Sequence, residues 1–173
     1  WKKGTKEARS VIDFLGKKAQ RDRDAALRSL LVMSLGRIGG DNAAAHLAGG
    51  MRNCDQVMRE FYYLALGISN SDDAGPILLD TLGRLKNSKD RAACALGLAL
   101  CGHKAAAPAL RELVEDGHPA FVPHGMVALG ILDDPKAIPI VQRVLKEERD
   151  PMIRREGAIA LAQISRNGMA MSV

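Results

Sequence analysis

Apolar residues recur along most of this chain at the three- and four-residue spacing of a helix face. One such run leads to Leu35 and a second leads to Leu66. The positions concerned are Ala26, Leu27, Leu30, Leu31, Ser34 and Leu35, then Val57, Met58, Phe61, Tyr62, Ala65 and Leu66. This spacing predicts helices, and no segment shows the sustained alternation of a strand. A glycine follows each final leucine, and we interpret it as the helix C-terminus, where a left-handed backbone suits glycine.

A second helix is predicted after each of these helices. Pro76, Pro108 and Pro139 suit its opening turn, where a missing N–H is harmless. Apolar columns align behind the prolines, and charged residues lie between the columns. The pattern is that of an amphipathic helix repeated three times.

The two landmarks keep one period, which indicates a repeat architecture. Leu-Gly recurs at spacings of 31, 30 and 33 residues, and a degenerate Leu-Ala follows 32 residues later. The leucines are Leu35, Leu66, Leu96, Leu129 and Leu161. A helical hairpin of this length cannot cover its own apolar face, so neighbouring hairpins must stack. The expected fold is all-α: a right-handed superhelix, or solenoid, of helical hairpins.

The chain is expected to form one domain over residues 1–173. Residues 1–20 would hold an N-terminal capping helix, with the apolar face Ala8, Val11, Ile12 and Leu15. About four and a half repeats would follow over residues 22–166, the last of them unfinished. Because the chain begins at Trp1, we expect it to be a piece excised from a longer protein.

An Asp-x-x-x-Arg motif followed by Ala-Leu-Gly resembles the HEAT repeat of the short kind found in phycobilisome (bilin) lyases. The residues that carry it are Asp24, Arg28, Asp55, Arg59, Asp150 and Arg154. The third and fourth repeats depart from it, with Lys89 and Val122 at the arginine position. The resemblance implies that the three pairs form a ladder of hydrogen bonds between stacked hairpins. It implies a fold much more strongly than a function.

The composition agrees with close-packed helices. Hydrophobic residues make up 47% of the chain but aromatic residues only 3%, so small aliphatic side chains must fill the core. The three cysteines, Cys54, Cys94 and Cys101, suit free thiols in buried sites or in a reducing compartment. The compartment stays open, with the cytoplasm slightly favoured. No apolar run reaches the roughly 20 residues that span a bilayer.

The net charge of +5 is concentrated at the start of the chain, where residues 1–40 hold ten Lys and Arg against four Asp and Glu. Such a basic region could meet nucleic acid through Lys17, Lys18, Arg21 or Arg23, or an acidic partner. It could equally be a solvated helix end.

No motif for catalysis or metal binding is recognisable. Cys94, Cys101, His103, His118 and His124 include good metal ligands but lack any known ligand spacing. HEAT-like hydroxylases hold iron with His-Glu dipeptides, and His124 is followed by Gly125 instead. Few aromatic residues are present to line a bilin pocket. We therefore predict no enzyme activity, no cofactor and no metal.

The function predicted from the sequence is a protein–protein interaction or scaffold module, with another protein or another domain of the same chain as its partner. The candidate docking face consists of polar residues aligned on successive second helices: Arg84, Arg111, Glu112, Arg143 and Glu147. Two alternatives remain open. One is a HEAT-like enzyme or enzyme subunit, bilin-lyase-like or metal-dependent. The other is weak nucleic-acid binding through the basic N-terminal region, which we consider less favoured because the second helices mix charges of both signs. The oligomeric state is left open.

Overall fold

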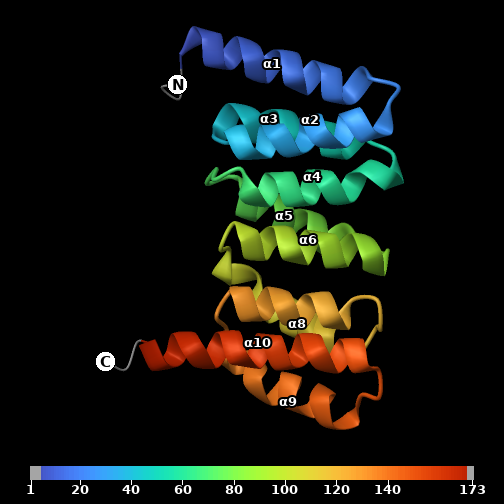
Figure 1. Cartoon of the computed structure of the whole chain (residues 1–173), viewed down its shortest axis with the longest axis vertical. Helices are drawn as coiled ribbons and strands as arrows, with labels where there is room; N and C mark the ends of the chain where they lie inside the picture. The colour runs from blue at the N-terminus through green and yellow to red at the C-terminus, as the bar shows by residue number, and fades with distance from the viewer. Residues whose placement is uncertain (1–4, 171–173) are drawn as a thin grey trace.

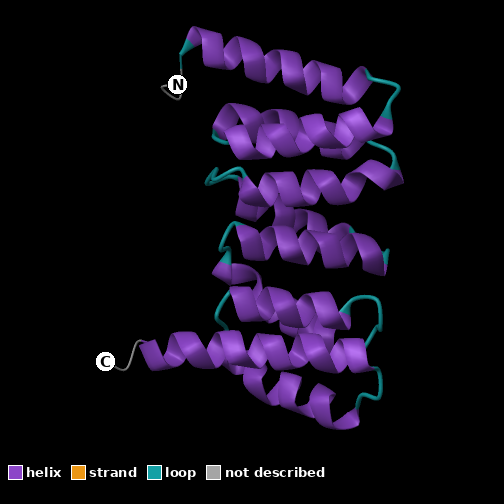
Figure 2. Ribbon diagram, viewed as in Figure 1, coloured by secondary structure: helices purple, strands orange, loops and turns teal. Residues whose placement is uncertain are grey.

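The structure is a computed structural model that describes residues 5–170, and the side chains of residues 5–166. This part of the chain contains helices and turns and no strand (Figure 2). The α-helices are α1 (Lys6–Arg21), α2 (Ala25–Ile38), α3 (Asp41–Asn53), α4 (Gln56–Ile68), α5 (Ala74–Arg84), α6 (Ser88–Leu100), α7 (Ala107–Glu115), α8 (Val122–Ile131), α9 (Ile138–Glu147) and α10 (Pro151–Ala170). Short 3-10 turns precede α7 and α9.

The helices form two rows along one axis, which confirms the predicted solenoid (Figure 1). The Leu-Gly helices α2, α4, α6, α8 and α10 stack directly on one another in the front row. In Figure 1 the second helices α3 and α5 lie behind this row and α9 lies below α10. The second helices pack against one another sparsely. Because each Leu-Gly helix is followed by an antiparallel partner, all Leu-Gly helices run parallel and their N-termini line one edge of the array.

Polar side chains start most of the Leu-Gly helices. Asp24, Asp55 and Asn87 each stand just before a helix and accept hydrogen bonds from backbone N–H groups of its first turn. These N–H groups have no partner inside the helix, so capping stabilises each helix by about 1 kcal/mol. The prolines at the start of the second helices lie in first turns, as predicted.

The glycines of the Leu-Gly pairs do not end their helices, and that prediction was wrong. Gly36, Gly67 and Gly130 are buried inside helices, where the backbone of the next Leu-Gly helix approaches. A Cβ atom on Gly67 would lie 2.7 Å from the Cα atom of Gly97. These glycines therefore allow helix-to-helix contact, and α2 ends at Ile38 with Gly39 as its C-cap, whose φ is 69°.

The third repeat also differs from its predicted alignment. In α6 the fully buried leucine is Leu98, whereas Leu96 is half-buried and lies outside the core. Leu98 therefore takes the place held by Leu66 and Leu129 in the neighbouring repeats. The two-residue shift puts Asn87 and Arg91, and not Lys89, at the positions of the Asp-x-x-x-Arg motif.

Helix α1 packs against both α2 and α3 and so covers one end of the array. His46 on α3 lies against Gly16 of α1 and hydrogen bonds to Asp13 at 2.8 Å. Residues 1–4 of the predicted capping helix lie outside the described residues. At the other end, α10 continues to Ala170 as one helix, past residue 166 where the predicted repeats end. Within the described residues no helix is both long and apolar enough to cross a membrane.

Candidate functional site

The predicted docking face lies on α5, α7 and α9, and internal ion pairs engage its three arginines. Arg84 pairs with Asp80 on its own helix at 2.7 Å and is highly exposed. Arg111 is mostly buried and forms a short ion pair with Asp134, which caps the turn before α9. Arg143 lies 3.6 Å from Glu115 of α7. Arg111 thus contributes to contact between repeats, which reduces the charge it can offer a partner.

A groove lies beside this face, between the end of α7, the start of α8 and α9. It has a volume of about 500 Å³ and is lined by Val114, Glu115, Gly117, Val122, Arg143, Val144, Glu147 and Glu148. Arg143 and Glu147 of the predicted face belong to its wall, and Glu112 is exposed on α7. Its charged lining consists of three glutamates and Arg143, and Arg143 is already close to Glu115.

Only some residues of the predicted ladder form bonds between repeats. Arg28 donates to Asp55 of the next repeat at 2.8 Å, and this bond lowers the pKa of the Asp55 carboxyl. Arg59 donates to Asp90 at 3.1 Å, because the corresponding cap of α6 is the neutral Asn87. Asp24 and Asp150 accept bonds from backbone N–H groups of α2 and α10. Arg154 is exposed and forms no ion pair among the described residues.

The cysteines and histidines do not come together. The part of the chain that the structure describes holds no group of three or more His, Cys, Asp or Glu side chains placed to bind a metal. Cys94 is completely buried and donates to the carbonyl of Leu78, and burial raises the pKa of its thiol to about 12. It is a core residue without a nucleophile's environment. His124 is exposed on α8, whereas His103 lies against Gly75.

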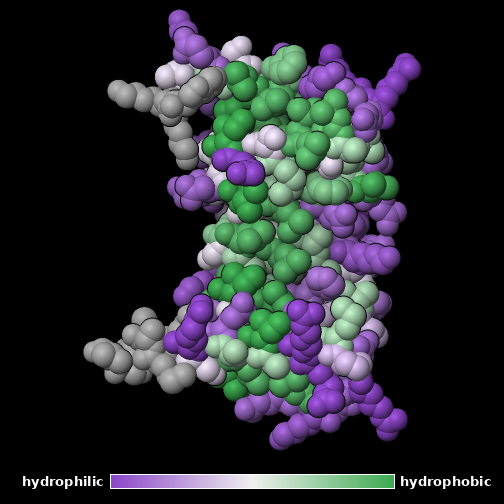
Figure 3. Space-filling model, in the orientation of Figure 1, coloured by the Kyte–Doolittle hydropathy of each residue, from purple (hydrophilic) through white to green (hydrophobic). Residues whose placement is uncertain are grey.

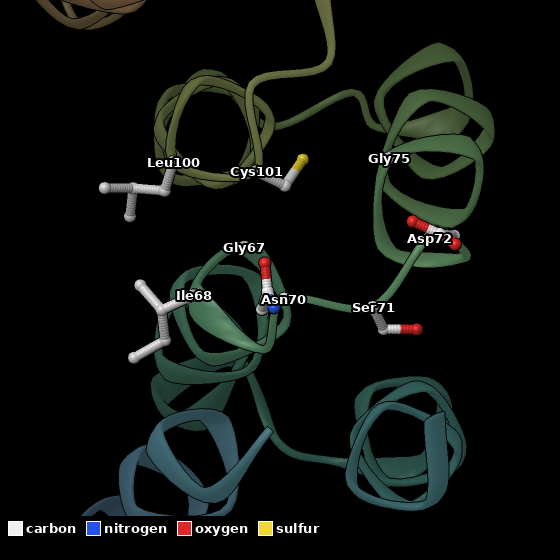
Figure 4. A pocket seen from close by; sticks show the side chains of 8 residues that line it. All are labelled: Gly67, Ile68, Asn70, Ser71, Asp72, Gly75, Leu100 and Cys101. Atoms are coloured by element: carbon white, nitrogen blue, oxygen red, sulfur yellow. The ribbon is translucent and has the colours of Figure 1, made fainter. Parts of the chain in front are cut away.

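A small pocket lies between the C-terminal ends of α4 and α6 and the start of α5 (Figure 4). Its volume is about 250 Å³, and its lining consists of Gly67, Ile68, Asn70, Ser71, Asp72, Gly75, Leu100 and Cys101. Burial raises the pKa of the Cys101 thiol, and Asp72 is the only carboxylate in the lining. The pocket therefore contains no acid–base pair. Ile68 and Leu100 point together to one side of it.

The strongest surface feature is apolar and lies on the Leu-Gly helices. Among the described residues, every large hydrophobic side chain that is well exposed belongs to α1 or to a Leu-Gly helix, and none to α3, α5, α7 or α9. Leu30 is 66% exposed, Val57 68% and Leu100 47%. A broad hydrophobic band runs along the long axis of the molecule on the face shown in Figure 3.

The corrected register explains this band. Successive repeats place apolar residues in equivalent outward columns, and many of them do not touch the core. We define the apolar face as these residues: Leu30, Val57, Leu64, Ile68, Leu96, Leu100, Val127, Ile131 and Ile159. The sequence pattern placed Leu30 and Val57 on apolar helix faces and Leu96 at the repeat leucine, and it did not indicate an exposed apolar surface. The available signal was that α8, with the sequence VPHGMVALGI, is apolar around its axis except at His124.

Comparisons with known proteins agree with this fold. A sequence model of HEAT repeats matches residues 76–162. The structure is similar to human deoxyhypusine hydroxylase, with 15% identity and a TM-score of 0.67 over 91% of this chain and 64% of that one. It is also similar to a chain in the complex of CpcE and CpcF of phycocyanin lyase from Nostoc, with 24% identity and a TM-score of 0.71 over 90% of this chain and 65% of that one. No curated protein sequence matches the chain significantly.

These structures correct one expectation. Both are named as enzymes, a hydroxylase and a lyase, so the prediction that this chain is not an enzyme was wrong as an exclusion. A missing motif does not exclude catalysis on a fold that enzymes share. The chain spans less than two thirds of each of these relatives, and identities of 15% and 24% show the fold alone.

Proposed function

Because the chain belongs to the HEAT-repeat family, we propose that it is a protein-docking module whose partner binds the apolar face. The observation that carries the proposal is the confinement of exposed large hydrophobic residues to the Leu-Gly row and α1. Scattered exposed apolar residues are normal, but a contiguous apolar surface usually marks an interaction site.

The shape of the array suits an extended partner. Five Leu-Gly helices packed about 8–10 Å apart give a row of roughly 40 Å. Ile68, Leu100 and Ile131 lie in one column across three consecutive repeats. A bound segment that covers them would bury apolar surface from both partners, which is the main driving force of association.

The experiment compares the two faces of the array. A variant with Leu100→Glu and Ile131→Glu places two charges in the centre of the apolar face. A control with Arg84→Glu and Arg143→Glu places two charges on the predicted polar face. All four side chains are exposed, so circular dichroism should show both variants folded.

We expect the apolar-face variant to lose at least nine tenths of the partner captured by the unmodified protein, and the control to retain it. The opposite result would assign docking to the polar face of Arg84, Arg111, Glu112, Arg143 and Glu147. Equal capture by all three proteins would reject both faces.

A second candidate function is that of a subunit in a two-chain enzyme. The likeness to a chain of the CpcE–CpcF complex favours it. In that case the partner captured through the apolar face is the second chain of the enzyme, and activity arises only when the two chains are combined. A captured partner that yields no activity when combined with this chain would count against this candidate.

A further inference from the structure

The apolar face lies between two edges of opposite net charge. We define the N-terminal edge as the segments where the Leu-Gly helices begin, and the opposite edge as the turns where they end. The N-terminal edge holds eleven Lys and Arg against seven Asp and Glu, counted over residues 21–28, 52–59, 85–91, 116–122 and 148–155. The opposite edge holds three against five, counted over residues 37–44, 69–76, 101–107 and 132–138.

Most acidic groups of the N-terminal edge are already engaged within the protein. Asp22 accepts from Lys18 at 2.7 Å, Asp55 from Arg28 and Asp90 from Arg59. Asp24 and Asp150 cap helices. Glu148 accepts bonds from the backbone of the turn that follows it. Ion pairing offsets the charges of Asp22, Asp55 and Asp90. Asp24, Asp150 and Glu148 keep their charge but offer fewer free oxygen atoms to a cationic partner.

Several cations of the same edge are exposed and form no ion pair among the described residues. They belong to the first, second, third and fifth repeats: Arg23, Arg52, Lys86, Lys89, Arg149, Arg154 and Arg155. Lys89 stands in the outward column that holds Val57 and Met152, so it borders the apolar face directly. The partial positive charges of the parallel helix N-termini act in the same direction. The fourth repeat contributes no Lys or Arg to this edge.

We infer that the partner segment is an acidic amphipathic helix, which lies along the apolar face with its carboxylates toward the N-terminal edge. This inference rests on the proposed function and names the chemistry of the partner. An apolar stripe on the helix would cover the apolar face, while Glu or Asp beside that stripe would meet the exposed cations. At 1.5 Å per residue, about 14–20 residues would span the central repeats.

Other partners fit this combination less well. A basic amphipathic helix would cover the same apolar residues but would place its cations against the N-terminal edge. A nucleic acid would use the cations and leave Leu100 and its neighbours uncovered. The combination of a hydrophobic band with one cationic rim therefore favours an acidic polypeptide.

The test uses two labelled model peptides and fluorescence anisotropy. One is an 18-residue helix with leucines on one face and glutamates elsewhere, and the other has lysine at every glutamate position. We expect the acidic peptide to bind at least tenfold more tightly at low salt, with a difference that shrinks as salt screens the charges.

Three variants separate the contributions. Lys89→Glu with Arg155→Glu should weaken binding of the acidic peptide at least tenfold and flatten its salt dependence. Leu100→Glu should weaken binding of either peptide. Lys104→Glu, in the turn at the opposite edge, reverses an exposed charge away from the N-terminal edge and should change neither.

Equal binding of the two peptides, or tighter binding of the basic one, would overturn the acidic-helix inference. Docking on the apolar face would survive that result if Leu100→Glu still weakened binding. Failure of both peptides to bind would also overturn the inference, and the capture experiment would then decide the docking proposal independently. A labelled oligonucleotide that binds regardless of Leu100→Glu and is lost with Lys89→Glu and Arg155→Glu would assign the cations to nucleic acid instead.

Discussion

Replacing Gly67 with alanine tests the argument that glycine sets the spacing of the Leu-Gly row. The added Cβ would lie 2.7 Å from the Cα atom of Gly97 and also against its carbonyl oxygen. Carbon atoms in contact prefer about 3.5–4.0 Å, so α4 and α6 would have to separate by about 1 Å. Both partners are backbone atoms, which cannot rotate away.

The magnitude follows from two opposing effects. Overpacking of this kind costs about 1–3 kcal/mol, and the backbone clash places Gly67→Ala at the upper end. Alanine recovers about 1 kcal/mol through its higher helix propensity. The net loss is therefore about 1–2 kcal/mol, which lowers the Tm by about 3–6 °C in a chain of this size.

A matched control is Gly49→Ala within α3. A Cβ atom there meets nothing within 4 Å, so only the propensity gain applies. Thermal melts followed by circular dichroism at 222 nm should show a lower Tm for Gly67→Ala and a higher Tm for Gly49→Ala. A Tm for Gly67→Ala equal to or above that of the unmodified protein would refute the reasoning.

Three further predictions concern buried groups. The Cys94 thiol, with a pKa raised to about 12, should resist a disulfide reagent until the protein unfolds, whereas the two half-buried thiols react earlier; prompt reaction of all three would contradict its burial. Burial raises the pKa of Tyr62 to about 12 and that of Tyr63 as well, so the unfolded state loses these protons first and stability should fall as the pH rises above about 10. Tyrosinate absorbance should then rise together with unfolding, and a separate earlier rise would argue against the assignment. Arg111→Ala leaves the nearly buried Asp134 without its cation, and urea titration should show a loss of about 1–3 kcal/mol, reduced when Asp134 is also replaced by asparagine.

The hairpin array could be predicted from the sequence because its signals are local and repeated. Proline at the start of a helix and aspartate at its cap act within one turn. The hairpin pattern occurs in about four near-copies, so each copy supports the assignment of the others. The stacking of hairpins then follows from their uncovered apolar faces.

The register of the third repeat could not be read from the sequence. The segment ALGLAL offers both Leu96 and Leu98 as the buried leucine. The structure buries Leu98, which puts Gly97 and Ala99 where neighbouring helices approach. That choice depends on packing against α4 and α8, which the local pattern does not contain.

The candidate sites were harder to predict for two different reasons. Arg111 lies on a helix surface in the sequence pattern, but Asp134, which is distant in sequence, engages it in space. Leu30 and Leu100 look like core residues in the pattern, although the core is already filled by their neighbours. Helices with apolar residues on every side do not reveal which side faces water.

The unequal contact within the two rows has a mechanical consequence. The front row is joined through backbone contacts at glycine, whereas the rear helices touch one another little. When the array bends, the glycine-linked Leu-Gly row, which we call the spine, would keep its spacing. The distances between the rear helices would then increase or decrease. A ligand on the spine would meet a template of nearly constant spacing, and one wedged between the rear helices would change the curvature of the whole array.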